Sequence, residues 1–323
     1  MLTSVALCTF NGEKYIASQL QSILDQTIAV NEIIICDDCS TDNTISIVNG
    51  FVRQNPDIIS LYINERNLGG RENFEKALKL TSGDFIFFSD QDDIWMKNKV
   101  ERILAVFNNN HLCEGIFTNA SLIDDKNTPL GTTLLDHTFF KPDLRENYTN
   151  ADLLYWSLLL GNIVTGATLA IRRTAVDNIL PFKLDFKRRL WHDAWIGYVL
   201  LLKQSMEYVD ECLIQYRVHP KQQIGINTEA EGPFEAVILK KSPDTFITLR
   251  ELYQKYLIAY LFIQEFLRVK YIANPVVDRI IHEYQELKLR YFMSLPFLQK
   301  KLRLFKWYIK SINDISFKDL ISL

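Results

Sequence analysis

The chain has 323 residues, 48% of them hydrophobic, and carries a formal net charge of −3 at pH 7. A chain of this length and apolar content folds around one large core or two, which excludes an intrinsically disordered protein. The slightly acidic balance argues against a general nucleic-acid binder, because such proteins need basic surfaces. No run of about 18 uncharged apolar residues is present, so the sequence predicts no membrane-spanning helix.

The N-terminus and the cysteines indicate a cytoplasmic protein. Residues 1–8 lead directly into strand-like sequence, without the basic and apolar regions of a signal peptide. Cys36 and Cys39 have CxxC spacing, but no second pair completes a four-cysteine zinc site. We interpret all five cysteines as reduced thiols, most of them in apolar segments: Cys8, Cys36, Cys39, Cys113 and Cys212.

The first third of the chain alternates predicted strands with predicted helices. Strands are expected at residues 5–9, 32–36, 58–63 and 84–89. Helices are expected at residues 13–26, 45–51 and 71–80, the second of them capped by Ser40, Thr41 and Asp42. A βαβαβαβ order is typical of a parallel sheet with crossover helices, so we predict an α/β fold.

Polar residues follow each of the first three strands. They are, in strand order, Thr9 and Asn11, Asp37 and Asp38, and Asn67 and Gly69. The carboxyl ends of parallel strands meet at one edge of a sheet, and ligands of open α/β sheets bind there. The chain has neither GxGxxG after its first strand nor GxxxxGK[ST], which argues against a dinucleotide dehydrogenase and a P-loop enzyme.

Three carboxylates follow the fourth predicted strand, at Asp90, Asp92 and Asp93. Like charges this close repel one another unless a positive group joins them. Mg²⁺ or Mn²⁺ suits carboxylate oxygens, and Mg²⁺ is usually held by one or two carboxylates together with substrate phosphates. The cluster therefore predicts a metal-assisted diphosphate site. The alternative at this point is a solvated acidic turn, because Asp is common in turns.

The rest of the chain is less regular. Strands are expected at residues 115–119, 166–172, 207–209 and 213–216, with a helix within 147–161 and another at 191–202. From about residue 230 the pattern becomes helical, with helices expected at 248–271, 276–291 and 297–312. The change predicts an α/β domain at residues 1–228 and a helical C-terminal region at 229–323.

Four segments within about the first 100 residues resemble glycosyltransferase family 2 enzymes of the GT-A fold. They are Thr9–Ile16 (TFNGEKYI), Asp37–Thr44 (DDCSTDNT), Asn67–Gly69 (NLG) and Ser89–Trp95 (SDQDDIW). Later segments resemble the bacterial rhamnosyltransferase branch, at Val164–Thr168 (VTGAT), His192–Asp193 and Tyr216–His219 (YRVH). The resemblance implies a Rossmann-like, mostly parallel sheet flanked by helices. Its nucleotide-binding half would span about residues 1–100 and its acceptor half about 101–228.

The resemblance implies transfer of a sugar from a nucleoside diphosphate to a hydroxyl group, with the nucleotide at the strand ends. Asp38 would accept a hydrogen bond from a uracil or thymine base, with helix capping as the alternative. Thr9 and Asn11 would contact the nucleotide, although a simple turn also accounts for each. Asp90 would contact the ribose or a water bound to the metal. Arg71 would touch the diphosphate, because a cation at a helix N-terminus is unfavourable without a bound anion; a solvated arginine is the alternative.

The metal is assigned by the same resemblance to Asp92 and His219. Asp92 forms the family's DxD pair with Asp90, and His219 would reach the metal or the diphosphate when its loop closes. A lone histidine is otherwise a structural residue. Asp93 would be a second ligand or a helix cap, and Arg217 would contact the diphosphate. The divalent cation, Mn²⁺ or Mg²⁺, would stabilise the departing diphosphate.

Asp193 is the candidate general base, because the corresponding carboxylate of the family faces the acceptor hydroxyl. Attack opposite the leaving group inverts the anomeric centre and needs no enzyme nucleophile. An aspartate favoured by the helix dipole is the alternative. Many family members have Glu-Asp where this chain has His192-Asp193, so His192 would orient Asp193, contact the acceptor or simply pack. Trp191 would stack on a sugar face or belong to the core.

The leading hypothesis for the substrates is dTDP-L-rhamnose as donor and a growing bacterial surface polysaccharide or lipid-linked oligosaccharide as acceptor. A rival with the same chemistry uses a UDP-hexose or a UDP-N-acetylhexosamine. A rival of another class is a non-catalytic sugar-nucleotide-binding or scaffold protein. The combination of Asp90, Asp92, Asp193 and His219 argues against that last hypothesis.

The C-terminal tail, from Gln285 onward, is basic and amphipathic. It holds eight Lys or Arg against three acidic residues, with aromatic and aliphatic residues between them. Such a pattern is typical of a helix at a membrane surface, which would place the protein at the inner face of the cell membrane. The alternative is a helix that packs on the catalytic domain or on the second subunit of a homodimer.

Overall fold

The computed structural model describes residues 1–145, 148–182, 191–219 and 277–285. The chain divides into two compact units, Met1–Phe234 and Glu235–Leu323. In the second unit, residues 277–285 are helical, and their buried residues recur at helical spacing at Val277, Ile280 and Tyr284. The expected helices at 248–271 and 297–312 lie outside the described residues, as does the basic tail beyond Gln285.

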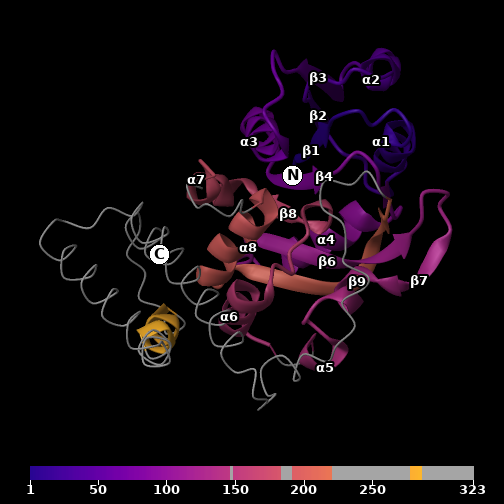
Figure 1. Cartoon of the computed structure of the whole chain (residues 1–323). Coiled ribbons are helices and arrows are strands. Elements are labelled where there is room, and N and C mark those ends of the chain that lie inside the picture. The colour runs from indigo at the N-terminus through magenta and orange to yellow at the C-terminus, as the bar shows by residue number, and fades with distance from the viewer. Residues whose placement is uncertain (146–147, 183–190, 220–276, 286–323) are drawn as a thin grey trace, which may run out of the picture. The chain divides into compact units, whose positions relative to one another are not determined.

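The first unit is built on one nine-stranded sheet of order β3-β2-β1-β4-β8-β6-β9-β5, with β7 paired to β6 (Figure 1). The first four strands are parallel: β1 (Thr3–Thr9), β2 (Glu32–Asp37), β3 (Ile59–Ile63) and β4 (Phe85–Ser89). The connecting helices are α1 (Ile16–Leu24), α2 (Thr44–Gln54) and α3 (Gly70–Leu80). The predicted strand–helix order of this half is confirmed.

The second half of the sheet mixes strand directions. Strand β8 (Ala170–Arg172) is antiparallel to β4 and to β6 (Gly115–Ile123). Strand β9 (Met206–Arg217) runs parallel to β6, and the two lie side by side in Figure 1 as the orange and magenta strands. Two short strands, β5 (Ile94–Trp95) and β7 (Pro129–Thr133), complete the sheet antiparallel to β9 and β6 respectively.

Strand β9 replaces two short strands that the sequence predicted at 207–209 and 213–216. Thr118 of β6 pairs with Val209 and the next residue, Asn119, pairs with Cys212. Asp210 and Glu211 are therefore extra residues in β9, accommodated by a register shift of the β-bulge kind. Asp210 and Glu211 interrupt the alternation of apolar and polar residues. The sequence pattern therefore suggests two short strands, although β9 is continuous.

Two other predictions about elements were wrong in detail. Only the end of the strand expected at 166–172 pairs with the sheet, because residues Gly166–Thr168 form a 3₁₀ helix, η2. Helix α2 has Asn43 at its N-cap, not the triplet 40–42. Asp42 still supports the first turn, because its carboxylate accepts a hydrogen bond from the backbone N–H of Thr44 at 3.0 Å.

The core lies between the sheet and its helices. Strand residues such as Leu7, Ile35 and Phe87 are fully buried, and α1 packs its apolar face of Ile16 and Leu20 into the same cluster. Removing such side chains from water stabilises the fold by about 1.5–3 kcal/mol each. The close-packed core holds the carboxyl ends of the strands in fixed positions.

Further helices follow β5 and surround the second half of the sheet. They are α4 (Lys99–Asn109), α5 (Pro142–Arg145), α6 (Asn150–Leu160), α7 (Val176–Ile179) and α8 (His192–Leu202), with 3₁₀ helices η1 (Leu134–His137) and η3 (Arg173–Ala175). Among the described residues, no helix has both the length and the apolar character that crossing a bilayer requires.

Candidate active site

A cavity of about 530 Å³ opens where strands β1, β2 and β4 end. Eight of the residues singled out in the sequence line it. Four come from the first half of the first unit: Thr9, Asp38, Asp90 and Asp92. Four come from its second half: Trp191, His192, Asp193 and His219. The fold therefore brings residues far apart in the sequence around one space.

Asp38 follows β2 and holds the loop before α3. Its carboxylate accepts hydrogen bonds from the N–H groups of Leu68 and Gly69 at 2.7 and 2.8 Å, and from Asn64 Nδ2 at 2.8 Å. Gly69 has a φ of +84°, a conformation that glycine adopts without strain. Asp38 is therefore no helix cap; the turn after β2 uses Asp37, which accepts from the N–H of Ser40.

Gln91 connects Thr9 to residues 90–93, the loop after β4 that is called the acidic loop below. Sequence reasoning missed this residue. The Thr9 hydroxyl and the Phe10 N–H both donate to Gln91 Oε1, at 2.7 and 2.8 Å. The only sequence signal that could have identified Gln91 is its position between Asp90 and Asp92. Asn11 does not line the cavity. Its side-chain oxygen accepts from the N–H of Thr41 at 2.8 Å, so it braces the neighbouring turn.

The three carboxylates after β4 have different surroundings. Asp90 and Asp92 face the cavity. Burial and the charges of Asp92 and Asp193 raise the pKa of Asp90 to about 7. Asp92 Oδ2 lies 2.8 Å from His219 Nε2. Asp93 points into the protein instead, where burial and its two acidic neighbours raise its pKa well above the ordinary value. The cluster is therefore not a solvated acidic turn.

Asp93 and Arg217 form a brace beneath the acidic loop. Asp93 Oδ1 accepts from the N–H of Arg217 at 2.9 Å, while Oδ2 has no hydrogen-bond partner within the described part of the chain. The Arg217 side chain is buried, and its Nε and Nη1 donate to the carbonyls of Asp92 and Asp124 at 2.6 and 2.9 Å. Its guanidinium also lies 4.5 Å from the ring centre of Tyr15. Neither Asp93 nor Arg217 lines the cavity.

Lys99, a second residue that the sequence did not single out, is fully buried behind the acidic loop. Its ammonium donates to the carbonyl of Ala167 at 2.8 Å and lies 4.0 Å from the ring centre of Trp95. Burial lowers its pKa to about 7, although the charges of Asp93 and Asp90 oppose the shift. Nothing in the sequence separates this buried lysine from the exposed Lys97 two residues earlier.

Asp193 is the second residue of α8 and lines the cavity. Its Oδ2 accepts from the N–H of Gly166 at 3.1 Å and its Oδ1 from the N–H of Ala194 at 2.6 Å. Burial raises its pKa to about 6, against the two backbone hydrogen bonds, which favour the ionised form. A Cβ at position 166 would lie 2.8 Å from His192 Nε2, so only glycine lets this turn approach α8 closely.

His192 is a neutral packed residue. It is 6% exposed and stacks on Phe74 with ring centres 4.0 Å apart. Burial lowers its pKa to about 3, and neither ring nitrogen has a hydrogen-bond partner in the described structure. Trp191, at the N-cap of α8, lines the cavity and is only partly exposed.

Arg71 does not line the cavity, although the preceding Gly70 does. Its guanidinium pairs with the adjacent carboxylate of Glu72 at 2.6 Å, which supplies the negative charge that the N-terminus of α3 favours. For metal ligands, the ranges that the structure describes contain no group of three or more His, Cys, Asp or Glu side chains arranged to hold an ion. Asp92 and His219 provide a pair.

The model of the family "Glycosyl transferase family 2" matches residues 4–180, which include β1 from its second residue, β2 to β4, the acidic loop and Gly166. The chain belongs to glycosyltransferase family 2. The predicted resemblance is therefore confirmed, and this family 2 member is a glycosyltransferase enzyme.

Curated relatives agree with this assignment. The dTDP-rhamnosyl transferase RfbG of Shigella flexneri is 42% identical over 248 residues, covering 73% of this chain and 79% of the relative. The Escherichia coli UDP-Glc:alpha-D-GlcNAc-diphosphoundecaprenol beta-1,3-glucosyltransferase WfgD is 33% identical over 59% of this chain and 84% of its own length. An uncharacterized glycosyltransferase of Nostoc sp. is 28% identical, and the chain spans 65% of its length.

Solved structures share the fold of this glycosyltransferase. S. aureus TarS 1–349 in complex with UDP-GlcNAc superposes with a TM-score of 0.58 at 19% identity, over 93% of this chain and 78% of that chain. The mannosyltransferase PcManGT of Pyrobaculum calidifontis, in complex with GDP-Man and Mn²⁺, gives 0.51 at 14% identity, over 98% and 88%. The predicted α/β fold of the GT-A type is confirmed.

Proposed function

We propose that this enzyme moves a sugar from a nucleoside-diphosphate donor to a hydroxyl of a saccharide acceptor with inversion, in bacterial surface polysaccharide synthesis. One observation carries the proposal: the carboxylate of Asp193 shares a single cavity with Asp38 and with the Asp92–His219 pair. A base, a nucleotide pocket and a diphosphate site are the three parts that such a transfer needs.

The nucleotide would bind where β1 and β2 end. Asp38, fixed by three hydrogen bonds, keeps one lone-pair position of its carboxylate for the N–H of a uracil or thymine base. Thr9 and Asp90 would contact the nucleotide beside it. Asn11 and Arg71 stay predictions as nucleotide contacts, and each would have to exchange its present partner for the ligand.

Asp92 and His219 would hold a divalent cation, Mn²⁺ or Mg²⁺. They fit such an ion because carboxylate oxygen and imidazole nitrogen come from two segments and already lie 2.8 Å apart. Two protein ligands suffice where substrate phosphates complete the coordination. When bound, the cation supplies Lewis-acid stabilisation of the departing diphosphate. Asp93 and Arg217 would support this pair from below.

Asp193 would be the general base. With a pKa of about 6 it is ionised at neutral pH, yet basic enough to accept a proton from a hydroxyl. The N–H groups of Gly166 and Ala194 fix the direction of the carboxylate. His192 would position Asp193 by packing against Gly166, and Trp191 would contact the acceptor.

For the donor, dTDP-L-rhamnose is supported by the Shigella flexneri relative, the more similar of the two with a stated donor. A UDP-hexose or UDP-N-acetylhexosamine is the second candidate, because the Escherichia coli relative is named for UDP-Glc and the TarS structure holds UDP-GlcNAc. The name of the Escherichia coli protein also supports a lipid-linked acceptor. The five unpaired cysteines support the cytoplasmic placement; membrane contact and a homodimer remain predictions about residues outside the described ranges.

A donor panel tests the proposal. Thermal unfolding is measured with dTDP-rhamnose, UDP-glucose, UDP-N-acetylglucosamine and GDP-mannose, each with and without Mn²⁺. One donor is expected to raise the midpoint more than the others and only with the cation, because ligand binding to the folded state stabilises it by mass action. A largest shift with a UDP-sugar would overturn the rhamnose assignment, and no shift with any donor would contradict the function itself.

A further inference from the structure

One wall of the cavity consists of residues to which the proposed function gives no role. It is formed by Leu134 and His137 of η1 and by the next residue, Thr138; these three residues are called the η1 wall. They lie in a stretch that neither the strand-end pattern nor the family motifs single out. The side chain of His137 is exposed, and the structure places it at the cavity.

The order of strands places the η1 wall at one end of the cavity. Asp38 follows β2, Thr9 ends β1 and the acidic loop follows β4, which are successive neighbours in the sheet. The turn that binds Asp193 precedes β8, the next strand. Helix η1 is attached to β6, the strand after β8, through the hydrogen bond from the Leu135 N–H to Asn119 Oδ1. Base pocket, diphosphate site, general base and η1 wall therefore succeed one another across the sheet.

We propose that the η1 wall binds the sugar ring of the acceptor, with His137 as its main polar contact. The inference rests on the proposed function. The attacking hydroxyl must lie at Asp193, so the remainder of the acceptor extends away from the nucleotide, and the next part of the cavity is the η1 wall. An imidazole has a hydrogen-bonding edge and a flat face, and a pyranose presents hydroxyl groups and an apolar face to match them.

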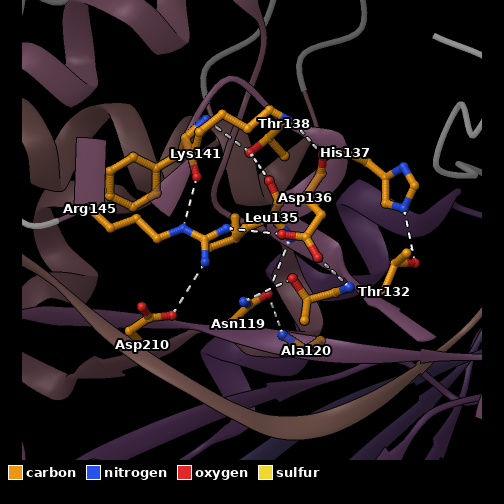
Figure 2. A network of polar contacts seen from close by, with 12 residues as sticks. Asn119, Ala120, Thr132, Leu135, Asp136, His137, Thr138, Lys141, Arg145 and Asp210 are labelled. Atoms are coloured by element: carbon orange, nitrogen blue, oxygen red, sulfur yellow. Dashed lines mark hydrogen bonds and ion pairs between the residues drawn. The ribbon is translucent and has the colours of Figure 1, made fainter. Parts of the chain in front are cut away.

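A network of polar contacts keeps the η1 wall in place (Figure 2). Asn119 Oδ1 accepts from the N–H groups of Ala120 and Leu135 at 2.9 and 3.2 Å, which joins η1 to β6. Asp136 closes a capping box with Thr133 at the start of η1. Backbone and side chains of the wall are thus ordered before any ligand arrives, and that order lowers the entropy lost on binding.

Arg145 supports the same segment from its far end. Its side chain is 8% exposed, and its Nε donates to the carbonyl of Phe140 at 2.9 Å. The guanidinium lies 3.6 Å from Asp136 and 3.5 Å from Asp210 of β9, as the dashed lines in Figure 2 mark. His137 Nε2 is oriented in turn by the hydroxyl of Thr132, 3.2 Å away. The η1 wall is therefore connected to both central strands of the acceptor half.

The test compares His137→Ala with His111→Ala, a histidine that is also exposed but does not line the cavity. Binding of p-nitrophenyl glycosides of rhamnose, glucose and N-acetylglucosamine is followed by saturation-transfer NMR, with the diamagnetic ion Mg²⁺ and either dTDP or UDP present. We expect at least one glycoside to bind the wild type and the His111 variant, and His137→Ala to weaken that binding about tenfold. His137→Gln, which keeps a polar side chain, should recover part of the loss.

Thermal shifts with nucleotide and Mn²⁺ separate the inference from the function on which it rests. They should be equal in the wild type and in His137→Ala, because the donor end of the cavity is unchanged. Unaltered glycoside binding by His137→Ala, or no glycoside binding by a wild type that does bind nucleotide, overturns the η1 assignment alone. If no nucleotide shifts the wild type, the proposed function fails and the η1 assignment fails with it.

Discussion

Asp90, Asp92 and Asp93 are neighbours in sequence with three different surroundings. Asp92 meets His219, Asp90 faces Asp193 across the cavity, and Asp93 turns inward to Arg217. The sequence predicted the acidic cluster, because carboxylates after a buried strand are visible in the sequence pattern. It did not predict their different contacts, since the partners of Asp93 and Asp92, Arg217 and His219, lie more than 120 positions later in the chain.

Asp193→Asn should lower kcat by a factor of about 10²–10⁴, the usual contribution of a general base, and leave donor binding unchanged. Asp177→Asn is a matched control, because Asp177 also lies in the first turn of a helix but is exposed and away from the cavity. Transfer rates and nucleotide thermal shifts check both variants. Near wild-type transfer by Asp193→Asn would exclude Asp193 as the base.

The rate of transfer should fall as the pH drops through about 6. Burial raises the pKa of Asp193 to about 6, and only its ionised form can accept the proton, so activity is present above that pH and lost below it. A pH profile of kcat at saturating donor should show one acidic limb near this value. An acidic limb at the ordinary pKa of an aspartate, near 4, would contradict the assignment.

Asp92→Ala should remove the part of the nucleotide thermal shift that depends on Mn²⁺, because the variant loses the carboxylate that faces His219. Asp57→Ala, an exposed aspartate elsewhere in the chain, should keep the shift. Titration of Mn²⁺ in the presence of UDP or dTDP gives a second measurement. If the Mn²⁺-dependent part of the thermal shift is as large in Asp92→Ala as in the wild type, Asp92 is not a metal ligand.

Among the elements, strand β9 contributes most to assembling the site. It pairs with β6 and β5, and its last residues bring Arg217 and His219 to the acidic loop. The sequence predicted only pieces of it, because the bulge at Asp210 and Glu211 disrupts the alternation. The four parallel strands were predictable, since short apolar runs between helical segments are a strong local signal. Long-range pairing such as β4 with β8 leaves no such signal.

Arg217→Met should lower the free energy of unfolding by roughly 2–4 kcal/mol, because two backbone carbonyls lose buried charge-assisted partners. Arg102→Met is the matched control, since Arg102 also pairs with β9, through Glu211, but is 48% exposed. That surface pair should contribute little to stability, because water and salt screen exposed charges. Urea unfolding measures both; equal effects of the two substitutions would show that Arg217 is no brace.

At the scale of the whole molecule, the described residues that line the cavity all lie between residues 8 and 219. The residues proposed for catalysis thus belong to the first unit, Met1–Phe234, and the predicted boundary at residue 228 falls beyond the last described residue that lines the cavity. The boundary was predicted from the change to a helical sequence pattern near residue 230, and Pro220, Gly225, Gly232 and Pro233 lie around it.

A chain ending at residue 228 is expected to fold and to bind nucleotide with Mn²⁺ within about twofold of the full chain's apparent affinity, since the truncation removes none of the described residues that line the cavity. Transfer rates of this shortened chain and of the full chain are then compared on a soluble glycoside and on a lipid-linked one. The comparison assigns a role to residues 229–323. Loss of nucleotide binding on truncation would place part of the donor site beyond residue 228.

The insertion of β8 between β4 and β6 also governs when the enzyme becomes complete during its synthesis. A ribosome adds about 5–20 residues each second, and N-terminal segments fold first where they are able. The strands that carry Asp38 and the acidic loop emerge early, but the sheet cannot continue past β4 until Ala170–Arg172 is made. A nascent chain therefore exposes one edge of β4 for several seconds, and the proposed metal pair of Asp92 and His219 cannot form before His219 has left the exit tunnel.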